Sequence, residues 1–433
     1  MRRDPAPGVA TVGSAGEPPV YRRFALLAFG TAAVGGVPLG AWMLTRLYWG
    51  GGEVPPAWLL LHAHLQIFEL FGVMILGIAH HLVPRFAGRP VVPARAPRLF
   101  VLVTVALALR IGGTASGHGG AVFLATALEA AAFAWFAVWL RRGLAAPDLA
   151  LTRRHLGLAT GWWIAALAVE AGARWPGKEP DPRAMRAVYA MALLGGAGGW
   201  ILGVLLRAAP MFVSGWRIST ALGRVAPWTL GAGVVAAVAG AAGGGAAGPE
   251  ALGRLGEALA AGTISAIALT GGALGRRRRA PALLLQGGQG GPDRALFRLA
   301  MVSVTVATVG FAVGAAIAAA GVPLGFLGDA LRHLFTVGFL TTMVVTMAFR
   351  LIPVLERVRL PWPRLRNVAF AALLAGVLLR SSEVLADWVW AGVLPWLPLS
   401  GLLVWVAVGS ALVSLLETMR APRRLPVGSD RAA

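Results

Sequence analysis

Long apolar runs recur along the whole chain, and they restrict its fold more than any other feature. The runs begin near residues 24, 57, 98, 120, 155, 186, 225, 251, 298, 327, 366 and 392. A helix needs about 20 apolar residues to cross the hydrocarbon core of a bilayer. The runs therefore predict an all-α, polytopic membrane protein with about twelve transmembrane helices. The run near 251 is the least apolar, because it contains Glu257.

The overall composition agrees with a membrane protein. Hydrophobic residues make up 57% of the chain and charged residues 13%, with a mean hydropathy of +0.72. A soluble domain has about 25% charged residues. The chain has no cysteine, which excludes disulfides, thiolate metal sites and covalent haem attachment through a Cys-x-x-Cys-His motif.

The net charge of +21 is distributed unevenly along the chain. Arginines gather at residues 2–3 and 22–23, 85–98, 141–154, 207–224, 276–298, 350–366 and after 420. These are the N-terminus, alternate loops and the C-terminus, and basic residues favour the cytoplasmic side of a membrane. We therefore expect both termini in the cytoplasm of a bacterial-type inner membrane. The charge is attributed to topology in the lipid bilayer, and no nucleic-acid partner is expected.

Few segments lie outside the apolar runs. Residues 1–21 and 421–433 are predicted to be disordered cytoplasmic tails around a single transmembrane domain, 22–420. A Gly- and Gln-rich stretch predicts a flexible cytoplasmic linker near 276–294.

Three of the apolar runs, the second, sixth and tenth, end in a similar way. The matching segments are Ile75–Phe86, Ile201–Phe212 and Val344–Leu355. In each, a histidine or arginine precedes a closing proline by three residues. Twenty residues before that proline lie His64, Ala190 and His333. The pattern predicts three pseudo-repeated four-helix units, two of which hold a histidine at the same depth.

Histidines near the outer ends of two of these helices are the candidate cofactor ligands. His62, His64 and His333 would lie near the outer face, where neutral imidazoles can bind haem iron or copper. Two histidines from two helices would hold a six-coordinate haem b, and copper is the second candidate metal. Side chains two apart on a helix point about 200° apart, so only one of His62 and His64 can face the iron. The internal alignment favours His64.

Other ionisable residues on these helices are candidates for supporting roles. Glu69 follows His62 by seven residues and is expected to share its helix face, in a proton relay or beside a ligand. His80 and His81 are expected at the inner interface or against a haem propionate or quinone headgroup. Arg350 is a candidate for the same relay or supporting role, or for an interfacial position. His118 and His155 are expected to be structural or solvated, and are the remaining histidines among the chain's seven.

The layout resembles the haem–copper oxidase subunit I superfamily, in which twelve helices form three pseudo-repeats and helices two and ten carry histidines. His62, Ala63 and Phe68 resemble that superfamily's low-spin haem ligand pattern on helix two. This match favours His62 over His64, so the choice between them stays open here.

The chain resembles the NnrS family more closely, in Leu61-His62-Ala63-His64 and in the segment from His333 to Met343, with Met347 and Arg350 beyond it. That resemblance implies a haem- and copper-binding membrane protein linked to nitric-oxide stress. It also implies that His62, His64 and His333 are the cofactor residues.

The chain departs from the oxidases at the copper site. Helix six has Ala190 in place of a histidine, helix seven has no histidine, and helix ten has His333 alone. Oxidase or nitric-oxide reductase chemistry at a binuclear centre is therefore not expected, and whether the protein is an enzyme stays open. We predict a haem protein acting in nitric-oxide stress response or electron transfer, with a redox partner or quinone. The alternative is a transporter with histidines in a proton path, which a helix broken at Gly195–Gly199 would favour.

Overall fold

The computed structural model describes residues 19–89, 96–175, 180–212, 219–243, 247–270, 291–322, 325–356 and 358–421. Within these ranges the regular structure is helical and there is no strand, which confirms the predicted all-α class. The predicted tails and linker fall mostly outside the described residues. At their edges two corrections apply. Tyr21 begins the first helix and is fully buried, and residues 291–294 begin a helix, with Pro292 in the first turn, where proline is tolerated.

The described part of the chain forms twelve long helices. Four of them consist of three consecutive segments each: α1 (Tyr21–Thr31), η1 (Ala32–Gly36) and α2 (Val37–Tyr48) form the first helix, α3 (Pro56–His64), η2 (Leu65–Val73) and α4 (Met74–Phe86) the second, α8 (Pro182–Tyr189), η4 (Ala190–Gly198) and α9 (Gly199–Phe212) the sixth, and α14 (Leu327–His333), η6 (Leu334–Thr341) and α15 (Thr342–Glu356) the tenth. The third, fourth and fifth helices are α5 (Ala96–Ser116), α6 (Gly119–Gly143) and α7 (Ala150–Ala173), and the seventh, eighth and ninth are α10 (Thr220–Ala242), α11 (Ala247–Ala268) and α13 (Gly291–Ala319). The eleventh and twelfth are α16 (Pro363–Ser381) and α18 (Leu397–Arg420). Short helices lie at Pro147–Leu149 (η3), Val384–Trp388 (α17) and Ala391–Trp396 (η7).

Eleven of the twelve are long and apolar enough to cross a membrane. The twelfth, α11, is the run weakened by Glu257, and it packs between α10 and α13. Small residues allow this close packing: a Cβ added to Gly240 of α10 would lie 2.3 Å from the Cα of Gly253 in α11. The chain is thus a multi-pass membrane protein.

Three of the helices form the centre of the bundle, and we call them the central helices: Pro56–Phe86, Pro182–Arg207 and Leu327–Glu356. Their apolar windows are 67–83% buried, against 33–50% for the other spans. The remaining helices surround them, and α18 packs against α2 to close the ring. Many large apolar side chains on the ring are exposed, such as Val101, Val306 and Leu378, as a lipid-facing surface requires.

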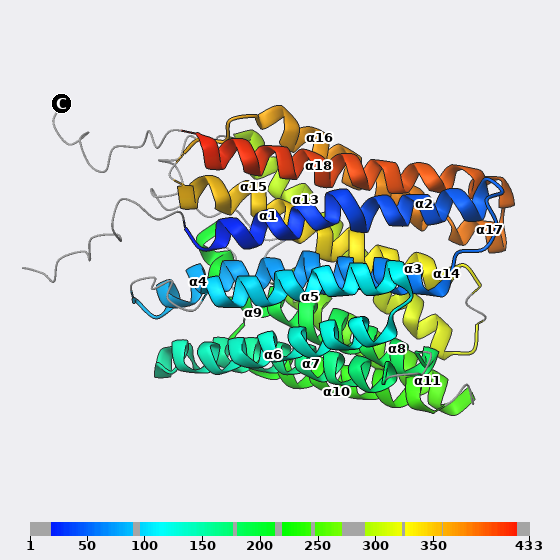
Figure 1. Ribbon diagram of the computed structural model, residues 1–433, viewed down its shortest axis with the longest axis horizontal. Helices are drawn as coiled ribbons and strands as arrows, with labels where there is room; N and C mark the ends of the chain where they lie inside the picture. The colour runs from blue at the N-terminus through cyan, green and yellow to red at the C-terminus, as the bar shows by residue number, and fades with distance from the viewer. Residues whose placement is uncertain are drawn as a thin grey trace, which may run out of the picture.

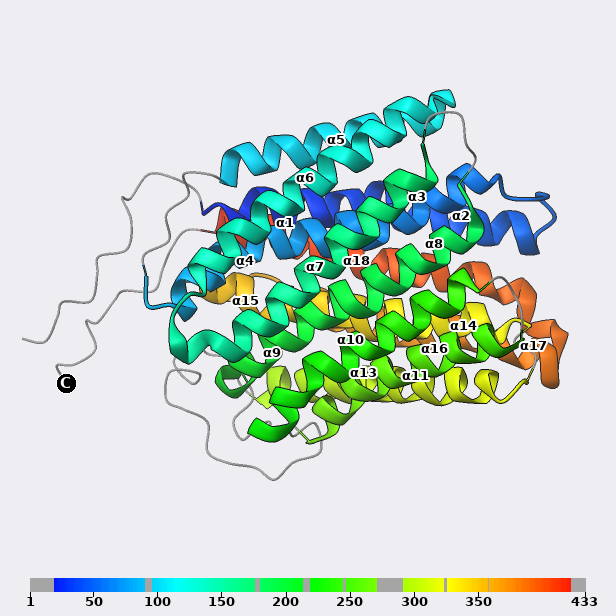
Figure 2. The same cartoon turned by 90° about the horizontal axis from the view of Figure 1, so that it is seen from below.

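The two ends of the bundle are distinct. Both ends of the described chain lie together with α4, α9 and α15, at what we call the terminal end (Figures 1 and 2). At the opposite, distal end lie α3, α14 and α17 (Figure 1). His62, His64 and His333 therefore share the distal end, while His80 and His81 lie toward the terminal end.

Each central helix contains a π-helical segment at the same position. The segments η2, η4 and η6 begin directly after His64, Tyr189 and His333. They meet in the middle of the bundle, where η4 contacts both η2 and η6. π-Helical segments are rare and occur often at functional sites. Their starts agree with the register of the repeat to within one residue, which supports the three-fold internal repeat that the sequence indicates.

The glycine-rich stretch of the sixth helix is continuous rather than broken. Cβ atoms added to Gly195 and Gly196 would lie 2.5 Å from Trp162 Cγ and 2.7 Å from Trp163 Cδ1. These glycines therefore make room for two tryptophans of α7. The helix break that would have favoured a transporter is not found there.

An apolar cavity of about 90 Å³ lies among the central helices toward the terminal end. Its walls come from α4, α9 and α15, and include Met74, Trp200, Met343 and Met347.

Candidate functional site

His62 and His64 lie against different neighbours, as their spacing predicts. The His62 ring lies against the first helix, and its Nδ1–H donates a hydrogen bond to the Gly36 carbonyl at 2.8 Å. A Cβ added to Gly40 would lie 2.5 Å from His62 Cε1. Glycine at position 40 therefore provides the space that the imidazole occupies.

His333 lies in a polar cluster at the distal end of the tenth helix. Its Nδ1–H donates to the Asp329 carbonyl at 2.9 Å and lies 3.5 Å from the Asp329 carboxylate. That carboxylate is ion-paired with Arg380, whose other amino group lies 2.6 Å from Glu383. Tyr48 donates to Glu383 at 2.6 Å. The cluster links the first, tenth and eleventh helices.

The structure brings His62, rather than His64, close to His333. The two imidazoles lie within electrostatic range of each other, and Asp329 and Arg380 lie within range of both. A carbonyl only accepts hydrogen bonds, so Nδ1 carries the proton in both rings. Nε2 is therefore the basic nitrogen of both His62 and His333.

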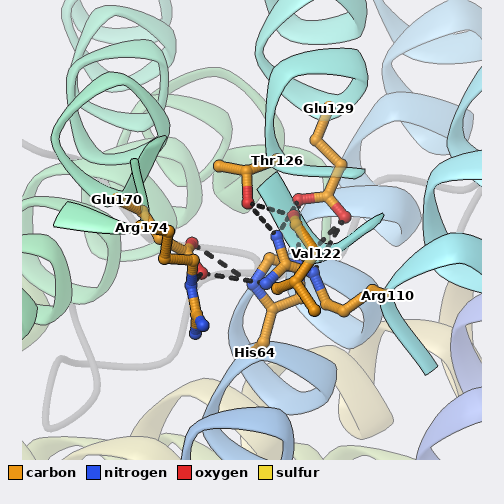
Figure 3. Close-up of polar contacts among 7 residues, drawn as sticks. All are labelled: His64, Arg110, Val122, Thr126, Glu129, Glu170 and Arg174. Carbon is orange, nitrogen blue, oxygen red and sulfur yellow. Dashed lines mark hydrogen bonds and ion pairs between the residues drawn. The ribbon is translucent and has the colours of Figure 1, made fainter. Parts of the chain in front are cut away.

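His64 belongs to a second, buried cluster between four helices. Its Nε2 lies 2.9 Å from Glu129 Oε2, and its Nδ1 lies 3.4 Å from Glu170 Oε2. His64 comes from α3, Arg110 from α5, Glu129 from α6 and Glu170 from α7, and Figure 3 shows them converging. We call these residues, with Glu69, the His64 cluster.

Arg110 joins the two carboxylates of this cluster. Its guanidinium lies 3.1 Å from Glu129 Oε2 and 2.8 Å from Glu170 Oε1, and it donates to Thr126 at 2.7 Å. Arg174, at the cluster's edge, donates to Glu170 at 2.8 Å (Figure 3). Buried charges are costly unless paired and hydrogen-bonded, and these side chains are both.

Glu69 lies with His64 rather than with His62, so the predicted shared face is wrong. One ligand atom from each of Glu69, His64 and Glu129 lies within 4.8 Å of the other two. The reason is the π-helical segment that begins at Leu65. It pairs residues five apart instead of four, which turns Glu69 beneath His64, five residues before it.

His80 and His81 are both buried, rather than exposed at an interface. His80 stacks on Trp139 with ring centroids 4.2 Å apart, and its Nδ1–H donates to the Leu76 carbonyl at 2.7 Å. His81 meets the edge of Tyr21 with ring centroids 5.3 Å apart, and its Nε2 is buried without a hydrogen-bond partner in the described part of the chain. Arg350 is partly buried in α15.

The other two histidines have structural surroundings. His118 precedes α6 and lies 3.1 Å from the Ser116 carbonyl, at the surface. His155 is buried, and its Nε2–H donates to the Gly223 carbonyl at 2.9 Å. Neither belongs to the clusters around His62 and His64.

Sequence reasoning missed Arg110, Glu129 and Glu170. Each is a charged residue within an apolar run, which is the property that singled out the histidines. One cation and two carboxylates in three consecutive runs indicate a buried ion-pair network. Applied to all ionisable residues, the same criterion would have found them.

A comparison with known protein families matches residues 21–423 to the family described as NnrS protein. No curated protein matches the chain. The matched region includes every described helix, all seven histidines and both polar clusters. The chain therefore belongs to the NnrS family.

Proposed function

We propose that this NnrS family member binds one haem b between His62 and His333. The proposal rests on a hydrogen bond that both imidazoles make. Each ring donates from Nδ1 to a backbone carbonyl, at 2.8 Å for His62 and 2.9 Å for His333. Metal-binding histidines characteristically donate their second nitrogen in this way. Each ring then offers a neutral Nε2, and the two rings come from different helices within electrostatic range.

A buried cation lies near both imidazoles. Arg380 lies within electrostatic range of both imidazoles and would bind a propionate, which is a carboxylate. Gly40 leaves space for the His62 ring, and Asp329 orients the His333 ring. These residues hold the ligands in position before any cofactor binds.

When bound, haem supplies a one-electron redox centre and an iron that can bind small gases. The chain's own residues hold that iron and set its surroundings. His62 and His333 would hold the iron through their Nε2 atoms, and the Asp329 carboxylate would increase the basicity of His333. A protein with this site would act in nitric-oxide stress response or in electron transfer, with a quinone or a redox protein as partner.

Copper at an oxidase-like binuclear centre is not part of this proposal. The sixth helix offers Ala190 and the tenth offers His333 alone, so the histidines for such a centre are missing from those helices. The kinship with haem–copper oxidase subunit I stays a prediction from the helix layout.

The orientation that we propose places the terminal end in the cytoplasm of a bacterial-type inner membrane. The arginine-rich segments of the sequence border that end, and such segments are translocated poorly. Phosphatase fusions after residues 52 and 321 should be active, and fusions after residue 425 inactive. The reverse pattern would overturn the orientation.

The absorption spectrum of the detergent-purified protein tests haem binding. Protein from haem-replete cells should show a Soret band and sharp low-spin bands after dithionite reduction, with haem that acidic acetone extracts. His62→Ala should lose these bands. His155→Ala, which removes another buried histidine, should keep them. A colourless wild-type protein, or an unchanged spectrum in His62→Ala, would contradict the proposal.

A further inference from the structure

We propose that the His64 cluster is a second metal site, which binds a divalent cation through His64, Glu69 and Glu129. This site is separate from the proposed haem, because it uses neither His62 nor His333. It lies among α3, η2, α5, α6 and α7, whereas the haem ligands face the first, tenth and eleventh helices.

The geometry brings three ligand atoms together in the membrane interior. One atom from each of His64, Glu69 and Glu129 lies within 4.8 Å of the others. A cation about 2.0–2.2 Å from each atom requires ligand separations below about 4.4 Å, so side-chain shifts of at most a few tenths of an ångström would close the three atoms around an ion. Glu129 is ten residues from the start of α6, or about 15 Å along the helix axis. The site therefore lies inside the bundle, about three helical turns from the start of α6.

Glu69 provides an independent indication of a missing partner. Its side chain is 1% exposed, and its Oε2 is buried with no hydrogen-bond partner among the described residues. Burying a carboxylate oxygen without a hydrogen-bond partner is energetically costly. Because Glu69 points at His64 and Glu129, a cation bound there would satisfy it.

The charges of the buried groups also favour a cation. His64, Glu69, Arg110, Glu129 and Glu170 are each at most 3% exposed. Three carboxylates and one guanidinium leave two negative charges if His64 is neutral. A divalent cation balances them, while Arg174 adds a partly exposed positive charge at the edge of the cluster.

The neighbouring residues can accommodate the ion without being displaced. Each Glu129 oxygen has a second lone pair, so Arg110 can keep its contact while Glu129 binds the metal. His64 would bind through Nε2, and its Nδ1–H would then donate to Glu170, which lies 3.4 Å away. This is the carboxylate–histidine–metal arrangement common in metalloproteins.

The donor set selects the type of metal. One imidazole and two carboxylates favour Mn²⁺, Fe²⁺ or Zn²⁺, whereas Cu(I) prefers thiolates and thioethers. The donor set therefore differs from the set that Cu(I) prefers.

Binding of Mn²⁺ to the purified, chelator-treated full-length protein tests the proposal, because bound Mn²⁺ loses the six-line electron paramagnetic resonance signal of the free ion. Wild-type protein should bind about one Mn²⁺ per chain, and Zn²⁺ should displace it. Glu69→Gln, which keeps the size of the side chain, should weaken binding by about tenfold or more.

Two controls separate loss of the site from loss of the fold. Glu356→Gln changes another buried carboxylate, one paired with Tyr21 and Arg22 at the terminal end, and should leave Mn²⁺ binding unchanged. Thermal unfolding should be similar in Glu69→Gln and wild type. No stoichiometric Mn²⁺ binding by wild type, or equal binding by wild type and Glu69→Gln, would overturn the site. Because the readout is Mn²⁺, it stays informative whether or not haem is bound.

Discussion

His62 and His64 are separated by one residue, yet their surroundings differ in kind. His62 donates from Nδ1 to a backbone carbonyl and lies near His333 and Arg380, so Nε2 is the ring nitrogen left for binding a ligand. His64 has a carboxylate at both ring nitrogens and a guanidinium beside them. One short motif on one helix therefore places two histidines in surroundings of different chemistry.

The largest effect is expected from His333→Ala. This change removes one of the two proposed axial nitrogens, so the iron should become five-coordinate or the haem should be lost. The low-spin absorption bands should disappear, while Mn²⁺ binding at the His64 cluster should stay unchanged. Low-spin bands that persist in His333→Ala would remove the tenth helix from the haem site.

Arg110→Met should have the largest effect on stability. It would leave Glu129 and Glu170 buried beside each other without their shared guanidinium. Breaking a buried ion pair typically costs about 3–5 kcal/mol. Unfolding in mixed detergent–SDS micelles should show a loss of this size. Arg254→Met, at a partly exposed pair with Glu257, should cost well under about 1 kcal/mol.

Gly40→Ala tests whether haem binding depends on the position of the His62 ring. The new Cβ would lie 2.5 Å from the imidazole, so the ring must move. Overpacking of this kind costs about 1–3 kcal/mol, and the low-spin haem spectrum should weaken. Gly30→Ala, on the same helix but with open space around the Cβ, should leave the spectrum unchanged.

Asp329→Asn should have the smallest effect, because it keeps the backbone carbonyl that holds His333 and changes only the carboxylate beyond it. Weaker support of the ligand should reduce haem affinity by about tenfold. Loss of a negative charge near the iron should raise the reduction midpoint, and each tenfold change in relative affinity corresponds to about 59 mV. An unchanged midpoint by redox titration would show that Asp329 does not act on the iron.

Much of this organisation is predictable from the sequence, because bilayer-crossing helices require long apolar runs. The runs located the helices, and the closing prolines indicated the repeat. The contacts of individual histidines are harder to predict, because spacing along the sequence gives the direction of a side chain only for an ideal α-helix. The π-helical segment after His64 turned Glu69 away from its predicted face.

A second reason why the surroundings of His64 are not predictable from the sequence is that its partners are distant from it along the chain. Nothing near His64 in the chain indicates that Arg110, Glu129 and Glu170 surround it. The choice between His62 and His64 as the neighbour of His333 likewise depends on how the first, tenth and eleventh helices pack. The internal alignment could give the depth of a residue but not the direction in which its side chain points.

The most direct test of the central claim measures both sites in both histidine variants of the same preparation. Haem is measured from the reduced absorption spectrum, and the second site from stoichiometric Mn²⁺ binding. The account predicts that His62→Ala loses the low-spin haem and keeps Mn²⁺ binding, while His64→Ala keeps the low-spin haem and loses Mn²⁺ binding. If both variants lose the same property, or if the two effects are exchanged, the assignment of the two histidines to two sites is contradicted.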